Sequence, residues 1–163
     1  MSVTDELIAN NESYAESFEH GHLPMPPGKK LAVVACMDAR LDVNQILGLA
    51  PGDAHVIRNA GGVVTDDEIR SLAISQNLLG TDEIILMHHT GCGMLTFTDE
   101  EFQAQLEEKT GSRPEWNSEA FADLDQNVRD SIARIKESPF VPNTDSVRGF
   151  VYEVETGKLR EVN

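Results

Sequence analysis

Short apolar runs that end abruptly in polar residues are the feature that most constrains the fold of this chain. Residues 31–35 and 84–87 are continuously apolar, as expected for buried strands, and strand-like and helix-like segments alternate around them. The patterns predict strands over 31–36, 54–58 and 83–88, and helices over 42–48, 66–79 and 99–109. Such alternation is typical of an α/β fold in which helices flank a mainly parallel central sheet.

Two of these helix starts carry a recognisable signal. Thr65 and Thr98 are each followed three residues later by a glutamate, the pattern of a capping box in which both side chains satisfy free backbone N–H groups. Beyond a loop over 111–117, apolar residues recur at helical spacing and predict a further core-packed helix that ends before Pro139: Phe121, Leu124, Val128, Ile132 and Ile135.

The two ends of the chain are expected to extend this body. Residues 4–18 predict a helix with Leu7, Tyr14 and Phe18 on one stripe, and a segment rich in proline and glycine follows, so residues 1–29 read as an arm and linker. Because a short helix with a thin apolar stripe gains little alone, we expect it to lie on the main body or, in preference, on a second copy. Residues 147–154 and 159–162 predict a C-terminal hairpin or added edge strand.

Size and composition favour one globular domain over residues 1–163. Hydrophobic residues make up 40% of the chain and charged residues 25%, and no window approaches the ~20 apolar residues that span a bilayer. The polar, acidic N-terminus does not resemble a signal peptide, so we expect a cytoplasmic protein. The net charge of −15 would repel phosphate backbones and anionic membranes, and we therefore expect neither nucleic acid nor membrane as a partner.

Candidate chemistry gathers where two predicted strands end. Cys36 ends the first strand, and His89 and Cys92 stand in an H-x-x-C spacing after the strand over 83–88. Open α/β sheets place ligands at the carboxyl edge, and two thiolates with an imidazole match the preference of zinc. His88 should face away from its neighbour and serve as a packed residue or as a residue that supports a metal ligand. The alternative is that the cysteines are only small buried residues.

The residues beside Cys36 favour the hypothesis of a zinc site. Asp38 and Arg40, two residues apart in a strand-to-helix loop, can form a charge-assisted pair, although a structural salt bridge or a helix cap at Asp38 or Asp42 would use the same residues. The glycines of the segment over 58–62 lack the spacing of a nucleotide-binding loop, which favours a tight loop beside the metal site.

These motifs together resemble the β-class carbonic anhydrases. The similarity lies in C-x-D-x-R over 36–40, R-N-x-[AG] over 58–61 and H-x-x-C over 89–92, and it covers roughly residues 30 to 95. The resemblance implies that Cys36, His89 and Cys92 hold Zn²⁺ and that Asp38 and Arg40 form the catalytic dyad. It implies reversible hydration of carbon dioxide to bicarbonate and a proton through zinc-bound hydroxide, in a homodimer or dimer of dimers.

One departure from the family concerns the substrate. Many members carry a glutamine shortly before the first cysteine ligand, whereas this chain has Pro26, Pro27, Gly28 and Lys29 there. A carbon disulfide or carbonyl sulfide hydrolase on the same zinc site therefore stays an alternative, as does a non-catalytic relative whose zinc is closed by Asp38. The sequence suggests Val63, Met94 and Leu95 as candidates for the substrate pocket.

Overall fold

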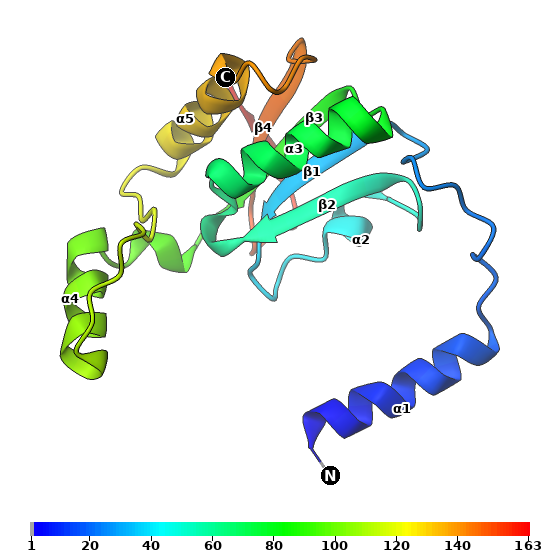
Figure 1. Cartoon of the computed structure of the whole chain (residues 1–163), viewed down its shortest axis with the longest axis horizontal. Coiled ribbons are helices and arrows are strands. Elements are labelled where there is room, and N and C mark those ends of the chain that lie inside the picture. Colours follow the sequence, from blue (N-terminus) through cyan, green and yellow to red (C-terminus); the bar gives the residue numbers. More distant parts are fainter. Residues whose placement is uncertain (1) are drawn as a thin grey trace.

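A computed structural model of the protein describes residues 2–163 and contains one five-stranded sheet in the order β2-β1-β3-β4-β5 (Figure 1). The strands are β1 (Leu31–Cys36), β2 (Ala54–Asn59), β3 (Glu83–His89), β4 (Ser146–Tyr152) and β5 (Leu159–Val162). The first four run parallel and β5 pairs antiparallel with β4, which confirms the predicted α/β fold and its C-terminal edge strand.

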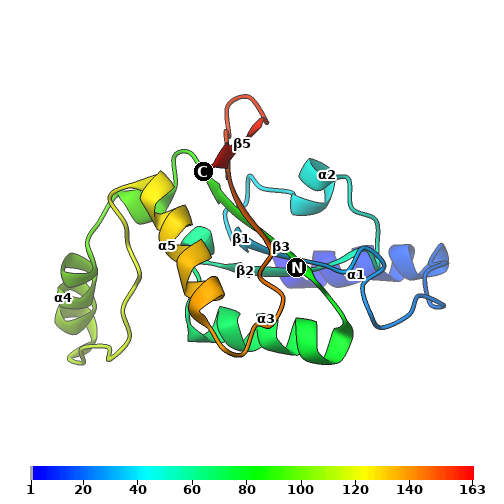
Figure 2. The same cartoon turned by 90° about the horizontal axis from the view of Figure 1, so that it is seen from above.

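Helices cover both faces of this sheet (Figure 2). The chain has five α-helices, α1 (Val3–Glu16), α2 (Val43–Leu47), α3 (Asp66–Leu79), α4 (Asp99–Thr110) and α5 (Leu124–Glu137). Of these, α2 packs on one face of the sheet, and α3 and α5 pack on the other. Short 3-10 turns, η1 (Ala60–Gly62) and η2 (Gly93–Leu95), follow β2 and β3. All the predicted helices are present, but the last one starts at Leu124, because Asp123 caps it by accepting from the Gln126 N–H. Phe121 therefore precedes this helix, contrary to the prediction.

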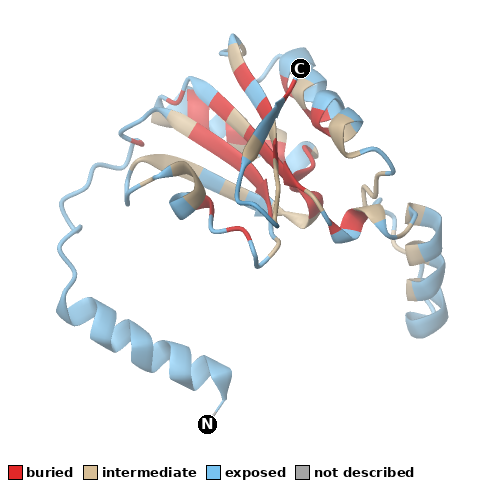
Figure 3. Cartoon of the chain, turned by 180° about the vertical axis from the view of Figure 1, so that it is seen from behind, coloured by how far each residue is buried: buried red, intermediate tan, exposed pale blue. Residues whose placement is uncertain are grey.

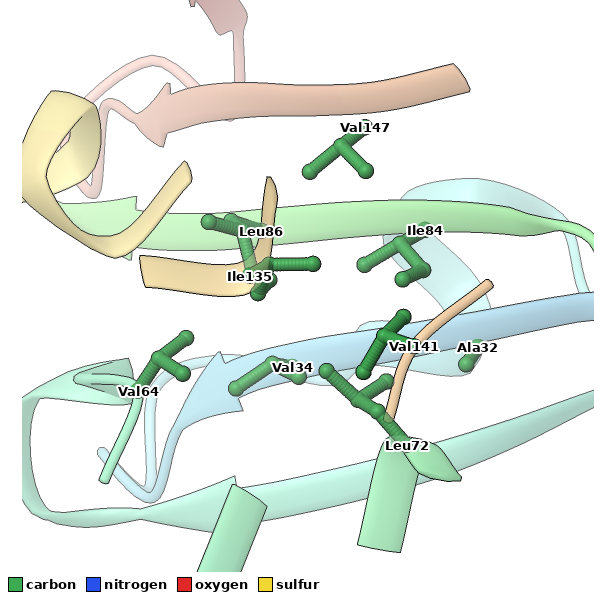
Figure 4. Close-up of a cluster of buried hydrophobic side chains, with 9 residues drawn as sticks. All are labelled: Ala32, Val34, Val64, Leu72, Ile84, Leu86, Ile135, Val141 and Val147. Carbon is green, nitrogen blue, oxygen red and sulfur yellow. The ribbon is translucent and has the colours of Figure 1, made fainter. Parts of the chain in front are cut away.

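The core is divided by the alternation of side chains along β1. Ala32 and Val34 face α3 and α5, where they join a cluster that includes Leu72 and Ile135 (Figure 4). Val33 and Ala35 face the opposite side and pack with residues of α2. Burying a side chain such as Leu72 contributes about 1.5–3 kcal/mol, so the sheet and its two layers form the stable frame of the molecule.

The helix starts expected from capping boxes occur at the expected places. Thr98 Oγ1 accepts from the Glu101 N–H at 3.2 Å, and the Glu101 carboxylate accepts from the Thr98 N–H at 2.9 Å. At α3, the Thr65 N–H donates to the Glu68 carboxylate at 2.9 Å. Both helices therefore begin where local sequence dictates.

Two helices stand apart from the sheet. The helix α1 lies at the end of an extended linker and none of its residues is buried, and α4 projects from the opposite side (Figures 1 and 3). Leu7 and Tyr14 of α1 are 59% and 56% exposed, so the apolar stripe of this helix is uncovered in the single chain. In residues 2–163, no helix combines the length and the apolar character needed to cross a bilayer.

Candidate metal centre

Three buried side chains, two from adjacent strands and one from the turn that follows, converge at the carboxyl edge of the sheet. Cys36 ends β1, His89 ends β3 and Cys92 lies in the turn that follows β3. The parallel register of β1 and β3, which pairs Ala35 with Met87, brings the two strand ends to the same level. The potential ligand atoms of Cys36, His89 and Cys92 all lie within 4.8 Å of one another.

The contacts of His89 direct one ring nitrogen toward the two cysteines. Its Nδ1 lies 2.8 Å from the carbonyl oxygen of Thr90, which can only accept, so Nδ1 carries the proton. Nε2 lies 3.2 Å from Cys36 Sγ and faces the two cysteines. A metal-binding histidine is typically oriented by such a hydrogen bond from its other ring nitrogen, which here is the bond from Nδ1 to the Thr90 carbonyl.

The neighbouring histidine faces the other side of the sheet. His88 is buried, and its Nε2 lies 2.7 Å from Asn127 Oδ1 on α5. This agrees with the expected packed role, and it leaves His89 as the histidine of the cluster. His20 and His22 are exposed in the linker, and His55 hydrogen-bonds to Ser75 on α3.

The pKa values of the two thiols in the cluster shift in opposite directions. Hydrogen bonding with Cys92, and then with His89, lowers the pKa of Cys36 despite the opposing effect of burial. Hydrogen bonding with Cys36 and burial raise the pKa of Cys92. Burial opposes protonation of His89, but its hydrogen bonds with Cys36 and Thr90 outweigh it and raise the pKa.

These donors fit zinc. Two sulfurs and one imidazole nitrogen, buried and within one ligand shell of each other, are the soft and borderline ligands that zinc selects. A divalent cation would stabilise both thiols as thiolates, so that both could bind it despite their different pKa values. Three protein ligands leave a fourth position free, which is the arrangement of a catalytic rather than a structural zinc site.

Asp38 borders the cluster and is held by Arg40. The Arg40 guanidinium donates from Nε to Asp38 Oδ1 at 2.9 Å and from Nη2 to Oδ2 at 2.8 Å, and the Arg40 backbone N–H adds a bond to Oδ1. These hydrogen bonds keep the pKa of Asp38 well below its usual range. Oδ2 lies 3.6 Å from His89 Nε2, so an ionised carboxylate stands beside the ligand atoms. Asp42, by contrast, caps α2 by accepting from the Gln45 N–H.

Glycines allow the loops around the cluster to approach closely. Gly91 has a φ of 63°, which lets the chain turn sharply between His89 and Cys92. Gly62 has a φ of 68°, and a Cβ atom there would lie 2.9 Å from the Cys36 backbone nitrogen. The glycine-containing segment after β2 is thus a tight loop packed against the end of β1.

A cavity of about 300 Å³ opens on the cluster. Cys36, Asp38 and Cys92 line one side, and Ala60, Gly61, Met94, Thr96 and Phe97 are among the other lining residues. Of the three pocket candidates, Met94 lines this cavity, Leu95 lines an adjacent hollow and Val63 lines neither. Thr96 and Phe97 were missed because no motif marks them; only the turn after Cys92 brings them round to the site.

The fold and the site define a carbonic anhydrase of the β-class, and the comparisons with known proteins agree. A model of the carbonic anhydrase family matches residues 31–159, so the chain belongs to this family. It is 61% identical over 162 residues to Beta-carbonic anhydrase 1 of Mycobacterium tuberculosis, with 99% of each chain covered. The resemblance seen in the sequence motifs is confirmed.

Solved structures and a more distant relative extend the comparison. The fold matches the crystal structure of the carbonic anhydrase from Streptococcus mutans with a TM-score of 0.94 and 47% identity, covering 100% of this chain and 99% of that one. The Carbon disulfide hydrolase of Saccharolobus solfataricus is 37% identical over 182 residues, covering 96% of this chain and 87% of its own.

Proposed function

We propose that this protein catalyses the reversible hydration of carbon dioxide to bicarbonate and a proton at a Zn²⁺ held by Cys36, His89 and Cys92. The observation that carries the proposal is the position of Asp38, whose carboxylate lies 3.6 Å from His89 Nε2 and lines the same cavity as both cysteines. A closed structural zinc site would have no use for an ionised carboxylate and a cavity at its open side.

The residues of the site have separate tasks. Zinc bound there would supply a Lewis acid that lowers the pKa of a coordinated water toward about 7. Asp38 cannot donate a hydrogen bond while it is ionised, so it accepts one from the attacking water and orients its lone pair toward the cavity. Arg40 keeps the Asp38 carboxylate ionised and aimed, because both of its donating nitrogens reach carboxylate oxygens.

The cavity suits a small, uncharged substrate. Ala60, Met94 and Phe97 provide apolar wall, which receives carbon dioxide without a desolvation cost. Product bicarbonate is charged and leaves such surroundings readily. The proton released by the overall reaction passes to solvent.

Carbon disulfide is the second candidate substrate, since a carbon disulfide hydrolase is similar to this chain over nearly its whole length. It is also a linear, uncharged molecule with an electrophilic carbon. The higher identity to a β-carbonic anhydrase favours carbon dioxide. The bidentate hold of Arg40 on Asp38 argues against the non-catalytic alternative, in which Asp38 would close the zinc site.

The assembly that we propose is a homodimer or dimer of dimers in which α1 packs on a second copy. Its support is the uncovered apolar stripe of α1, since a lone 14-residue helix is marginal in water.

A cytoplasmic location is supported by the two free cysteines, Cys36 and Cys92. Their thiols stay available for a metal in a reducing compartment, where disulfides rarely form.

The deciding experiment combines metal analysis with gas assays. We expect one zinc per chain and rapid hydration of carbon dioxide in stopped flow, lost on zinc removal by a chelator and restored by zinc. Parallel assays with carbon disulfide and carbonyl sulfide rank the substrates. Full zinc loading without hydration at pH 7 or at about pH 8.5, above the ~7 of zinc-activated water, would overturn the proposal.

A further inference from the structure

The loop that carries both Cys36 and Asp38 is held by an arginine from a different strand. Arg58, in β2, donates to the carbonyl oxygen of Cys36 from Nε at 3.0 Å and from Nη2 at 2.7 Å. The same Nη2 donates to the carbonyl oxygen of Asp38 at 2.8 Å. One side chain thus joins the backbone of a metal-ligand candidate to the backbone of the dyad aspartate.

The sheet register explains how Arg58 reaches these two carbonyl groups. Arg58 pairs with Ala35, one residue before the end of β1, so its side chain lies beside the place where the chain leaves the sheet. The last backbone hydrogen bond between β2 and the chain that leaves β1 joins the Met37 N–H to the Asn59 carbonyl oxygen at 2.7 Å. Beyond it the strand pairing has ended, and Arg58 continues the connection between β2 and the loop.

Arg58 is not explained by an ion pair. Within residues 2–163 Arg58 makes no salt bridge. Arg70, by contrast, pairs with the carboxylate of Asp67. Its three hydrogen bonds all go to backbone oxygens of the loop. A planar guanidinium can contact two acceptors in fixed directions, which a lysine ammonium cannot reproduce.

The two arginines of the site therefore have different targets. Arg40 holds the carboxylate of Asp38, and Arg58 holds its peptide backbone. The Asp38 carbonyl also accepts from the Leu41 N–H at 3.0 Å, which closes the turn that leads into α2. With both contacts in place, the Cα atoms of Cys36 and Asp38 keep a fixed separation, and so do the thiolate and the carboxylate that they carry.

We propose that Arg58 is a positioning residue that sets the geometry of the Cys36–Asp38 loop for metal binding and for orientation of the attacking water. This inference rests on the proposed function only for its effect on turnover; its effects on the loop and on zinc affinity are independent of the substrate. Loss of the guanidinium frees two carbonyl groups and lets the carboxylate move relative to the cluster. Groups that orient metal ligands in this way typically change metal affinity or activity about 10- to 100-fold.

The test compares Arg58→Lys and Arg58→Met in the zinc-loaded full chain. We expect a fall of about 10- to 100-fold in kcat/KM for hydration, in zinc affinity measured against a chromophoric chelator, or in both. Amide hydrogen exchange should quicken by at least about tenfold at Met37 and Leu41, while the amides of β3 keep their protection. Because Arg58 is exposed, both variants should fold.

Arg70→Met is the matched control, since it removes an exposed guanidinium from α3 and should leave all three measurements unchanged. Wild-type zinc affinity, amide exchange and turnover in Arg58→Lys would overturn the proposal. A positive charge without the planar guanidinium would then be enough to hold the loop. If exchange and zinc affinity change as expected while even the wild-type protein hydrates no carbon dioxide, Arg58 keeps its role and the proposed function fails.

Discussion

Arg40 and Gly91 are joined by a hydrogen bond of 3.1 Å, from the guanidinium Nη2 to the carbonyl oxygen of the glycine. This bond connects the loop that follows Cys36 at the end of β1 to the turn after β3 that carries Cys92. The same Nη2 donates to Asp38 at 2.8 Å, so the orientation of the carboxylate and the shape of the turn depend on one side chain. Arg40 therefore connects the two halves of the candidate metal centre.

Replacing Asp38 with alanine should reduce carbon dioxide hydration without releasing zinc. In the proposed mechanism the carboxylate orients the attacking water, and it is not part of the Cys36, His89 and Cys92 group, so we expect kcat/KM to fall about 10- to 100-fold with zinc content unchanged. Stopped-flow assays with metal analysis measure both quantities. Asp67→Ala, on the exposed side of α3, is the control, and wild-type turnover in Asp38→Ala would exclude the assigned role.

The adjacent histidines should respond in opposite ways to replacement by alanine. His89→Ala removes a proposed zinc ligand and should release zinc to a chelator, whereas His88→Ala should keep zinc. His88→Ala leaves Asn127 Oδ1 without its donor and should lower the free energy of unfolding by about 1–3 kcal/mol. Zinc analysis and urea unfolding separate the two effects. Loss of zinc from His88→Ala with retention by His89→Ala would reverse the assignment.

Two glycines with similar positive φ angles provide a test of close packing at the site. Gly48 has a φ of 65° with no atom within 4 Å of an added Cβ, and Gly62 has a φ of 68° with the Cys36 nitrogen at 2.9 Å. Gly48→Ala should cost about 1–2 kcal/mol of backbone strain. Gly62→Ala should cost about 1–3 kcal/mol more because backbone atoms must move.

Chemical unfolding and zinc titration of both glycine variants measure these costs. We expect zinc affinity to fall only in Gly62→Ala, since the displaced atoms belong to the end of β1. Equal stability and equal zinc affinity in the two variants would show that the loop after β2 adapts freely to a methyl group.

The pair between Arg160 on β5 and Asp125 on α5 should make a small, pH-dependent contribution to stability. Its two hydrogen bonds, at 2.9 and 2.8 Å, hold the pKa of Asp125 below its unfolded value of about 3.9. A lowered pKa stabilises the fold above the unfolded value, and this contribution is lost as the pH falls through the folded value. Because both side chains are partly exposed, we expect at most about 0.5 kcal/mol.

Urea unfolding of Asp125→Asn at pH 7 and below about pH 4 checks the expected direction. The variant should be less stable than the wild type at pH 7, and the difference should shrink in acid. Asp130→Asn, on the same helix, is the control, because Asp130 accepts from Gln126 rather than from arginine. A difference that grows in acid would contradict the sign.

Local signals in the sequence predicted most of the elements. The apolar run before Cys36, the capping box at Thr98 and the turn over 155–158 each depend on neighbours in the chain, and the elements occur where these signals stand. The start of α5 was predicted too early because Phe121 continues the apolar spacing of the helix. Asp123 overrides that spacing by capping the helix at Leu124.

The sequence by itself determined the order of strands and helices and indicated that Cys36, His89 and Cys92 come together, because chain-local patterns and motif spacing encode both. Only the tertiary structure decided which backbone groups surround them. Arg58 reaches the carbonyl groups of Cys36 and Asp38 because β2 pairs with β1 in one register, and Phe97 lines the cavity because the turn after Cys92 brings it back. Contacts across strands depend on register and loop path, which no local pattern specifies.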